Sequence, residues 1–380
     1  LTMYAVGDCA PFRKDLASSF VHVTEMFKSA DFVFGQLESV LGTERLEISS
    51  CTRFGCSSRP EVAKVMKDAG FDVLSFASNH ALDYGRTAFN ETLKHIREAG
   101  MYVTGAGENE AIAREYPIVD VEGTKIAILG FGSILPQGFW AEESRPGVNP
   151  ARGITAYIPV EHDQPGTPCR VFTFPHPDDL KNMLEAIQEA KKKVDIVIVS
   201  MHWGIHFVEG EIADYQRYYA HFAIDAGADL ILGHHAHVLK PIEIYKGKVI
   251  FYSLSNFAME EPCNMLQDQK LKGQDMATSK SHLEMTEINA GFATTTRFFP
   301  MDCYMTMVAK WEVKDKKITK VSYLPAYLPV DCAPYVLKSG DPMFSQINDY
   351  MFKITKNTDM DTSIYKVAGD EVILDCGTQK

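Results

Sequence analysis

The stretch that decides the fold reads ADLILGHHAH and runs from residue 228 to residue 237. Its apolar part follows a helical pattern at residues 212–226, an order typical of a buried strand in an α/β sheet. The carboxyl ends of such strands are where α/β sheets place their ligands, and three histidines stand there. Neutral imidazole is the commonest metal ligand, so the stretch predicts an α/β fold with a metal site. Alternatively, one or two of these rings are ordinary buried histidines.

Polar side chains of related kinds follow four other apolar runs. Because the carboxyl ends of parallel strands meet at one edge of a sheet, we expect these side chains to lie together. Carboxylates, an amide and imidazoles suit a pair of divalent first-row ions that share one carboxylate. Taken singly, each residue has a plain alternative as a turn residue, helix cap or Asx turn. The set is Asp8 after residues 3–7, Glu38 after 31–35, Asn79, His80 and Asp83 after 72–76, and His202 and His206 after 194–199.

The length of 380 residues fits one α/β domain that carries insertions. We expect the main domain over residues 1–330, with loop insertions at 132–175 and 258–298, and a C-terminal extension over 331–380 packed on it. Long loops in compact domains are usually lids or binding segments. Trp140 in the first insertion is therefore a candidate substrate contact, unless the loop packs only on itself.

Composition argues against several classes of partner. The net charge is −12, from 50 acidic and 38 basic residues, and the basic residues are dispersed apart from residues 191–193, which disfavours nucleic acid. The eight cysteines include no C-x-x-C pair, which favours a reducing compartment, although Cys51 and Cys56 could pair after export. The sequence shows neither an apolar run of about 18 residues nor a signal-like leader. We therefore expect no membrane segment and a cytoplasmic protein, or an exported one if a leader was removed.

Six motifs in order resemble the CapA-type poly-γ-glutamate capsule protein family, a branch of the calcineurin-like metallophosphoesterase superfamily. The resemblance covers residues 3–257. It implies a four-layer α-β-β-α sandwich of the metallophosphoesterase kind. The motifs are Gly7-Asp8, Leu37-Glu38, Asn79-His80-x-x-Asp83-x-Gly85, His202-Trp203-Gly204, Gly233-His234-His235-x-His237-Val238 and Ser253-Leu254-x-Asn256-Phe257.

The resemblance also implies roles for these residues and one or two divalent ions, Mn, Fe or Zn. Asp8, Glu38 and His237 would hold one ion. The other would be held by Glu38 as the bridge, with Asn79, His202 and His235. His80, oriented by Asp83, would act as a general acid. Candidates for contacting the substrate or supporting the ligands are His206, His234, Asn256, Arg59 and Trp140.

Departures from the family pattern lie near the same crevice. Ala10 occupies the superfamily's histidine position, which leaves the first ion short of one ligand. His206 stands where the branch usually has Glu, and Ala236, Lys240 and Ser255 also differ from the branch. These changes suggest a substrate other than a capsule polymer.

We therefore expect a metal-dependent hydrolase that acts on a phosphoester or an amide or γ-glutamyl-type bond of a small molecule or peptide. One alternative is a peptide or amino-acid epimerase that uses the crevice for proton transfer. Another is an assembly factor in poly-γ-glutamate synthesis. The sequence does not set the oligomeric state.

Overall fold

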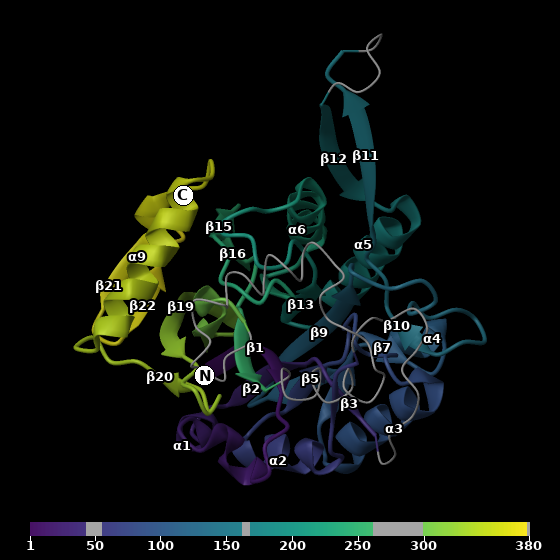
Figure 1. Ribbon diagram of the computed structural model, residues 1–380, viewed down its shortest axis with the longest axis horizontal. Coiled ribbons are helices and arrows are strands. Elements are labelled where there is room, and N and C mark those ends of the chain that lie inside the picture. Colours follow the sequence, from purple (N-terminus) through teal and green to yellow (C-terminus); the bar gives the residue numbers. More distant parts are fainter. Residues whose placement is uncertain (43–54, 162–167, 261–298, 378–380) are drawn as a thin grey trace, which may run out of the picture.

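The computed structural model describes residues 1–42, 55–161, 168–260 and 299–377. Most of the expected insertion at 258–298 lies outside these residues, and so does Cys51. Two large β-sheets dominate the described chain, and they lie face to face (Figure 1).

The first sheet has ten strands, and its centre is formed by the N-terminal strand β1. The main path is β21-β22-β19-β18-β1-β2-β5-β6, while β17 also pairs with β1 and β20 with β19. The pairs β1–β2, β2–β5 and β1–β17 are parallel, so their carboxyl ends meet at one edge. The strands are β1 (Thr2–Ala10), β2 (Phe32–Leu37), β5 (Val73–Ser75), β6 (Tyr102–Thr104), β17 (Asn256–Met259), β18 (Met305–Lys314), β19 (Lys317–Tyr327), β20 (Tyr335–Val336), β21 (Tyr365–Ala368) and β22 (Glu371–Leu374).

The second sheet has six strands in the order β15-β16-β14-β13-β9-β8. Its central pairs β9–β13 and β13–β14 are parallel, which again brings strand ends together. The strands are β8 (Ile118–Val121), β9 (Thr124–Gly132), β13 (Ile196–His202), β14 (Leu230–His234), β15 (Ile242–Tyr245) and β16 (Lys248–Phe251).

Helices cover the outer faces of both sheets. Residues of α1, α2 and α3 pack with Tyr4 and Val33 on the first sheet, and residues of α5 and α6 pack with Val197 and Val199 on the second. A third apolar cluster fills the space between the sheets. The predicted four layers, α-β-β-α, are confirmed. The helices are α1 (Thr24–Lys28), α2 (Glu61–Ala69), α3 (Gly85–Glu98), α4 (Glu110–Ala113), α5 (Pro177–Lys191), α6 (Asp214–Ala226) and α9 (Pro342–Lys356).

The layering explains why the strands are apolar throughout. In β13, Ile196 and Ile198 face the other sheet, whereas Val197 and Val199 face the helices. A strand buried on both faces must be apolar at every position, unlike a strand with one face in water. The continuous run at residues 194–199 therefore specifies a central strand.

Three shorter strand pairs lie outside the two sheets. The expected loop insertion at 132–175 contains strands as well as irregular chain, and its last part is a β-hairpin that projects from the body (Figure 1). Residues 335–374 add β20, β21 and β22 to the first sheet. The pairs are β3 (Val40–Leu41) with β4 (Ser57–Ser58), β7 (Ala106–Gly107) with β10 (Gly147–Val148), and β11 (Gly153–Pro159) with β12 (Cys169–Pro175).

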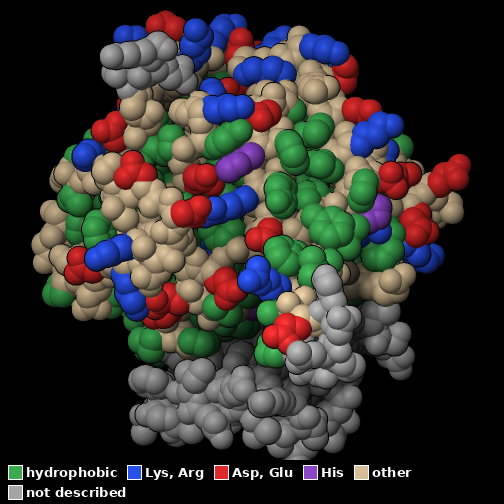
Figure 2. Space-filling view, turned by 90° about the horizontal axis from the view of Figure 1, so that it is seen from above, with side chains coloured by type: hydrophobic (Ala, Val, Ile, Leu, Met, Phe, Trp, Pro, Cys, Tyr) green, Lys and Arg blue, Asp and Glu red, His purple; other side chains and the backbone are tan. Residues whose placement is uncertain are grey.

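The surface carries both signs of charge. Acidic and basic side chains are interspersed over the face that Figure 2 shows. Among the described helices, none has both the length and the apolar character needed to span a membrane.

Two glycines allow the backbones to approach closely where the sheets meet. A Cβ at Gly7 would lie 1.8 Å from the carbonyl oxygen of Ser255, and one at Gly233 would lie 2.2 Å from that of Tyr252. The approach at Gly7 lets the Asp8 N–H donate to the same Ser255 oxygen at 3.0 Å. Glycine at position 7 therefore fixes β1 against the segment that leads into β17.

We expect Gly7→Ala to destabilise the protein by about 2 kcal/mol or more, because an overpacked contact with backbone cannot relax by a rotamer change. Denaturant unfolding measures this difference. Gly340→Ala is the matched control, since a Cβ there meets no atom within 4 Å of it, and its effect should stay within about 0.5 kcal/mol. Equal stabilities of the two variants would contradict this account of the packing.

Candidate metal centre

Strand ends from both sheets converge on one buried space. Asp8 in β1 pairs in register with Gln36 of β2 and with Asn256 of β17. In the second sheet, His202 ends β13 and pairs in register with His234 at the end of β14. The carboxylate side chains thus come from the first sheet and the imidazoles from the second.

Two groups of three side chains in this space have the spacing of metal sites. One group is Glu38, His202 and His235, and the other is Asp8, Glu38 and His237. Within each group the candidate ligand atoms lie within 4.8 Å of one another, and all five residues are buried. Glu38 belongs to both groups, which is the arrangement that a bridging carboxylate requires.

Asn79 adds a fourth donor to the first of these groups. Its Oδ1 lies 2.7 Å from Nε2 of His202 and 3.0 Å from Nδ1 of His235, and these two ring nitrogens are 3.2 Å apart. Oε1 of Glu38 is 3.5 Å from Nε2 of His202. Ligands about 2.1 Å from one ion lie roughly 3 Å from each other, so the four atoms fit a single divalent ion.

In the other group, Asn256 orients His237. Nδ1 of His237 donates to Oδ1 of Asn256 at 2.7 Å, and the amide of Asn256 is itself fixed by donating to the carbonyl of Cys303 at 3.2 Å. This network assigns the proton to Nδ1. The lone pair of Nε2 is then left toward Glu38, whose Oε1 is 3.8 Å away. Such support of a ligating histidine is typical of metal sites.

The turn after β14 holds an unusual backbone conformation. His235 has φ of 86° and His237 has φ of 57°, in the left-handed region that non-glycine residues seldom adopt. Strain of this kind costs roughly 1–3 kcal/mol per residue and concentrates at functional sites. Here it accompanies the convergence of both rings on Glu38.

Burial keeps the imidazoles neutral. It holds the pKa of His202 and of His235 well below the ordinary value, lowers the pKa of His237 to about 4, and lowers that of His234 to about 3. Asp8 and Glu38 are fully buried in the same space, and ionised carboxylates there would need positive charge that neutral imidazoles do not supply. A divalent cation would balance them, so the donor set suits hard or borderline metal ions such as Mn, Fe or Zn.

His80 and Asp83 lie beside the two groups. Nδ1 of His80 is 2.6 Å from Oδ2 of Asp83, and this carboxylate oxygen also accepts the N–H of Cys56 at 2.7 Å. His80 is partly exposed, whereas Asp83 is buried. His80 is therefore more accessible to solvent than the carboxylate that orients it.

The remaining candidates fall into two kinds. His206 is exposed, and its ring lies 3.7 Å from that of His235, so it borders the centre. His234 is buried behind Asp8, with Nδ1 3.8 Å from Oδ1 of the carboxylate. Both flank the candidate ligands, one on the solvent side and one on the protein side.

Arg59 and Trp140 have other contacts. Nη2 of Arg59 donates to the carbonyls of Arg13 and Lys14 at 2.8 and 2.9 Å. The ring of Trp140 packs under the guanidinium of Arg152 at 4.7 Å. The contacts described for these two side chains link them to neighbouring loops.

Two residues outside segment 203–213 hold it in place: Tyr215, which no sequence motif singles out, and Lys240, which stood out only as a departure from the family pattern. Tyr215 accepts the N–H of Gly204 at 2.8 Å through its hydroxyl, just after His202. Buried Lys240 donates to the carbonyls of Val208 and Glu211, and burial lowers its pKa to about 8. No spacing in the sequence links these positions, because the contacts form only when the segment folds back on α6 and β14.

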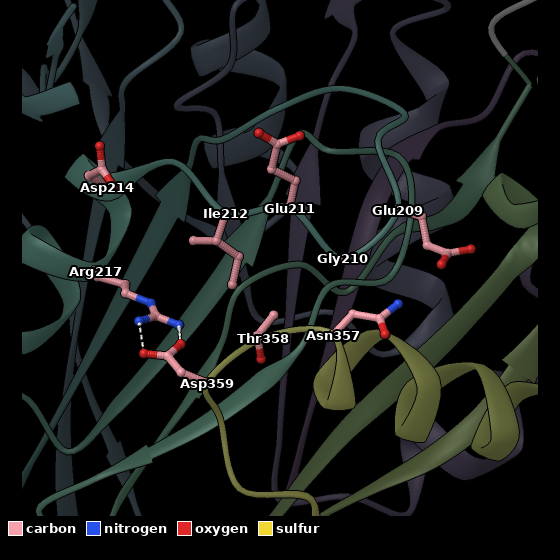
Figure 3. Close-up of a pocket in the computed structure, with 9 residues that line it drawn as sticks. All are labelled: Glu209, Gly210, Glu211, Ile212, Asp214, Arg217, Asn357, Thr358 and Asp359. Atoms are coloured by element: carbon pink, nitrogen blue, oxygen red, sulfur yellow. Dashed lines mark hydrogen bonds and ion pairs between the residues drawn. The ribbon is translucent and has the colours of Figure 1, made fainter. Parts of the chain in front are cut away.

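The same segment borders a hollow of about 410 Å³ that is separate from the candidate metal centre and is shown in Figure 3. Glu209 and Glu211 line it from this segment, and the ion pair of Arg217 with Asp359 lies at one end. Segment 203–213 thus presents His206 to the candidate metal centre and acidic side chains to a separate hollow.

Ala10 lies in an apolar cluster with Val238 and Met259. The position that the superfamily gives to histidine therefore supplies no donor here. The group of Asp8, Glu38 and His237 has one fewer donor than the group completed by Asn79.

Comparisons with known proteins agree with the sequence motifs. Residues 2–261 match the family model described as bacterial capsule synthesis protein PGA_cap. The PGA biosynthesis protein CapA of Bacillus subtilis (strain 168) is 31% identical over 318 residues, which cover 81% of this chain and 76% of that protein. The capsule biosynthesis protein CapA of Bacillus anthracis is 31% identical over 71% of this chain and 62% of its own length. The CapA-type resemblance is confirmed.

Solved structures with some similarity include the calcineurin-like phosphoesterase YfkN from Bacillus subtilis. It has a TM-score of 0.42 at 13% identity and covers 94% of this chain and 97% of that one. A putative 5'-nucleotidase from Staphylococcus aureus has a TM-score of 0.43 at 12% identity, covering 93% of this chain and 58% of that one.

We expect metal titration of the purified chain to show two binding steps, the tighter one at the group that contains Asn79, because that group has one more donor. Asn79→Ala should weaken the tighter step by about 10- to 100-fold, and Glu38→Ala should abolish both. Calorimetric titration with Mn²⁺ or Zn²⁺ measures the steps. Exposed His22 provides the control His22→Ala, which should bind like the unchanged protein. Two unaltered steps in Glu38→Ala would rule out the shared carboxylate.

We expect the metal-free protein to lose stability as pH falls. The pKa of His234 is about 3 when folded and about 6.5 when unfolded, so protonation favours the unfolded chain. The contribution is fully present above pH 6.5 and is lost progressively toward pH 3. Unfolding free energies measured in chelator from pH 7 to pH 4 should fall less steeply in His234→Leu, by up to about 1.4 kcal/mol per pH unit. Identical slopes would contradict the assignment.

Proposed function

The chain belongs to the bacterial capsule synthesis protein family PGA_cap, and we propose that it is a metal-dependent hydrolase of γ-glutamyl-type amide or phosphoester bonds. The observation that carries the proposal is Glu38, which stands between two groups of buried ligands. Two divalent ions that share one carboxylate can activate a water and clamp an oxyanion, and both effects serve hydrolysis.

When bound, the two ions would supply an activated water near neutral pH and positive charge for the developing oxyanion. The chain's own part is to hold the donors in place before the substrate arrives. Asn256 fixes the ring of His237, and the in-register pairing of β13 with β14 fixes His202. Because these supports are buried, little reorganisation would be needed during the reaction.

His80 is the proposed general acid. Asp83 accepts the Nδ1 proton of His80, so the other ring nitrogen is the one left to exchange a proton with the leaving group. A buried carboxylate also stabilises the charged imidazolium, which is the form that donates. The N–H of Cys56 holds the Asp83 carboxylate in its orientation.

The names of the relatives and the exposed ring of His206 support the proposed substrate class. Two relatives are named for PGA or capsule biosynthesis, and a Mycobacterium tuberculosis relative, 34% identical over 47% of this chain and 43% of its own length, is named a probable polyglutamine synthesis accessory protein. Hydrolysis of γ-glutamyl bonds would serve such a role. The exposed ring of His206 at the entrance offers a hydrogen-bonding group to a carboxylate or phosphate of the substrate.

Proton transfer at an α-carbon is a second candidate, favoured by one observation. Ala10 leaves the group of Asp8 and His237 with fewer donors, and a partly filled group would free these residues for acid and base chemistry. Incorporation of solvent deuterium at the α-carbon of a γ-glutamyl peptide without bond cleavage would identify this reaction.

We expect the metal-loaded protein to hydrolyse a γ-glutamyl anilide or bis(p-nitrophenyl) phosphate, with His80→Ala lowering kcat by about 10²- to 10⁴-fold while metal content stays unchanged. His80→Ala should lose most on substrates with poor leaving groups, because these need the acid. Asp83→Asn should follow in the same direction and shift the pH profile.

The control is again His22→Ala, which should leave kcat unchanged. Three results would contradict the hydrolase proposal. They are full activity of the unchanged protein after metal removal, full activity of Asn79→Ala or His235→Ala, and an unchanged rate in His80→Ala on every substrate.

A further inference from the structure

The hairpin of β11 and β12 forms an arm that projects from the body of the protein (Figure 1). Large apolar side chains are exposed along it, and Tyr157 is the most exposed at 69%. A two-stranded hairpin standing alone in water is marginally stable. The exposed apolar residues of this arm are Tyr157, Ile158, Val160, Val171, Phe172 and Phe174.

The two edges of the arm differ. On the β12 edge, the N–H of Thr173 donates to Oδ2 of Asp214 at 3.1 Å, and Oγ1 of Thr173 accepts the N–H of Tyr215 at 3.1 Å. The start of α6 therefore covers this edge. On the other edge, β11 pairs with β12 alone among the described strands.

Proteins usually protect such an edge with Lys, Pro within the strand, a bulge or a covering segment. The β11 strand has none of these before its last residue, Pro159, and it contains no charged residue. Its register with β12 is regular over seven pairs. The β11 edge is thus an open template for another strand.

We propose that two copies of this chain associate through this edge, with β11 pairing antiparallel to β11 of the second copy about a two-fold axis at Ala156. A four-stranded sheet, with the two arms continuous across the axis, results from this pairing. The inference is independent of the proposed hydrolase activity.

The direction of the backbone groups permits this register. Because the N–H of Thr173 points away from β11, the residue paired with it, Thr155, also directs its N–H and C=O outward. Tyr157, two residues further along β11, also directs its backbone N–H and C=O outward. An axis at Ala156 places Thr155 of one copy opposite Tyr157 of the other, so these outward groups bond reciprocally.

The side chains are also self-complementary in this register. Ile154 would lie opposite Ile158 on one face, and Thr155 opposite Tyr157 on the other, both of them favourable cross-strand pairs. Charge favours the same choice of partner. The chain carries −12 overall, so most of its surfaces repel a second copy, whereas β11 and β12 contain one charged residue, Arg170. Pairing β11 with β11 of a second copy therefore brings no like charges together within these strands.

Cross-linking tests the register directly. At the axis, Ala156 would face its own copy in a non-hydrogen-bonded pair, with Cα atoms about 4.5 Å apart, which is within reach of a disulfide. Ala156→Cys in a Cys169→Ser background should give a covalent dimer under mild oxidation, whereas Cys169→Ser alone should not. Absence of the covalent dimer in a folded Ala156→Cys protein would overturn the register.

Sedimentation of the full chain tests the association itself. The unchanged protein and Thr155→Ala should sediment as dimers, because Thr155→Ala keeps the backbone N–H. Thr155→Pro removes an outward N–H without touching the bonds to β12, and it should sediment as a monomer with an unchanged circular dichroism spectrum. A monomeric unchanged protein, or a dimeric Thr155→Pro, would overturn the proposal.

Discussion

Two fully buried carboxylates, Asp8 and Glu38, face neutral imidazoles between the sheets, and the rest of the structure depends on this arrangement. Burying charge is costly unless a partner or a metal ion offsets the loss of hydration. The fold places these carboxylates where several strand ends converge, with the glycine contact at Gly7 holding β1 against the segment before β17. Divalent ions would offset the buried charge, which ties the stability of the centre to its proposed chemistry.

Much of this centre was predictable because each candidate ligand stands next to the strand that positions it in the sequence. Asp8, Glu38 and His202 each follow an apolar run, and parallel strands bring their carboxyl ends together whatever the loops do. The four layers follow from the same runs, since a strand such as 194–199 without polar positions must be covered on both faces. These predictions rest on the period of the strands and on the side of the sheet at which each one ends.

Other features depend on how loops fold back, which local patterns do not encode. The contact of Tyr215 with Gly204 joins positions that no motif relates, and the contacts of Trp140 with Arg152 depend on the path of the first insertion. The same holds for the arm, where a stretch rich in Gly and Pro was expected as loop but pairs over seven residues. β-Branched and aromatic residues at 154–158 and 171–174 carry this signal, although Gly and Pro on both sides obscure it.

Anomalous diffraction from crystals grown with Mn²⁺ tests the central claim most directly. The account predicts two peaks on either side of Glu38, one among His202, His235 and Asn79 and a weaker one between Asp8 and His237. A single peak at the Asn79 group would mean that Ala10 leaves the other group unable to hold an ion. Peaks elsewhere, or none at Glu38 in crystals soaked with Mn²⁺, would contradict the claim that this carboxylate bridges two metal ions.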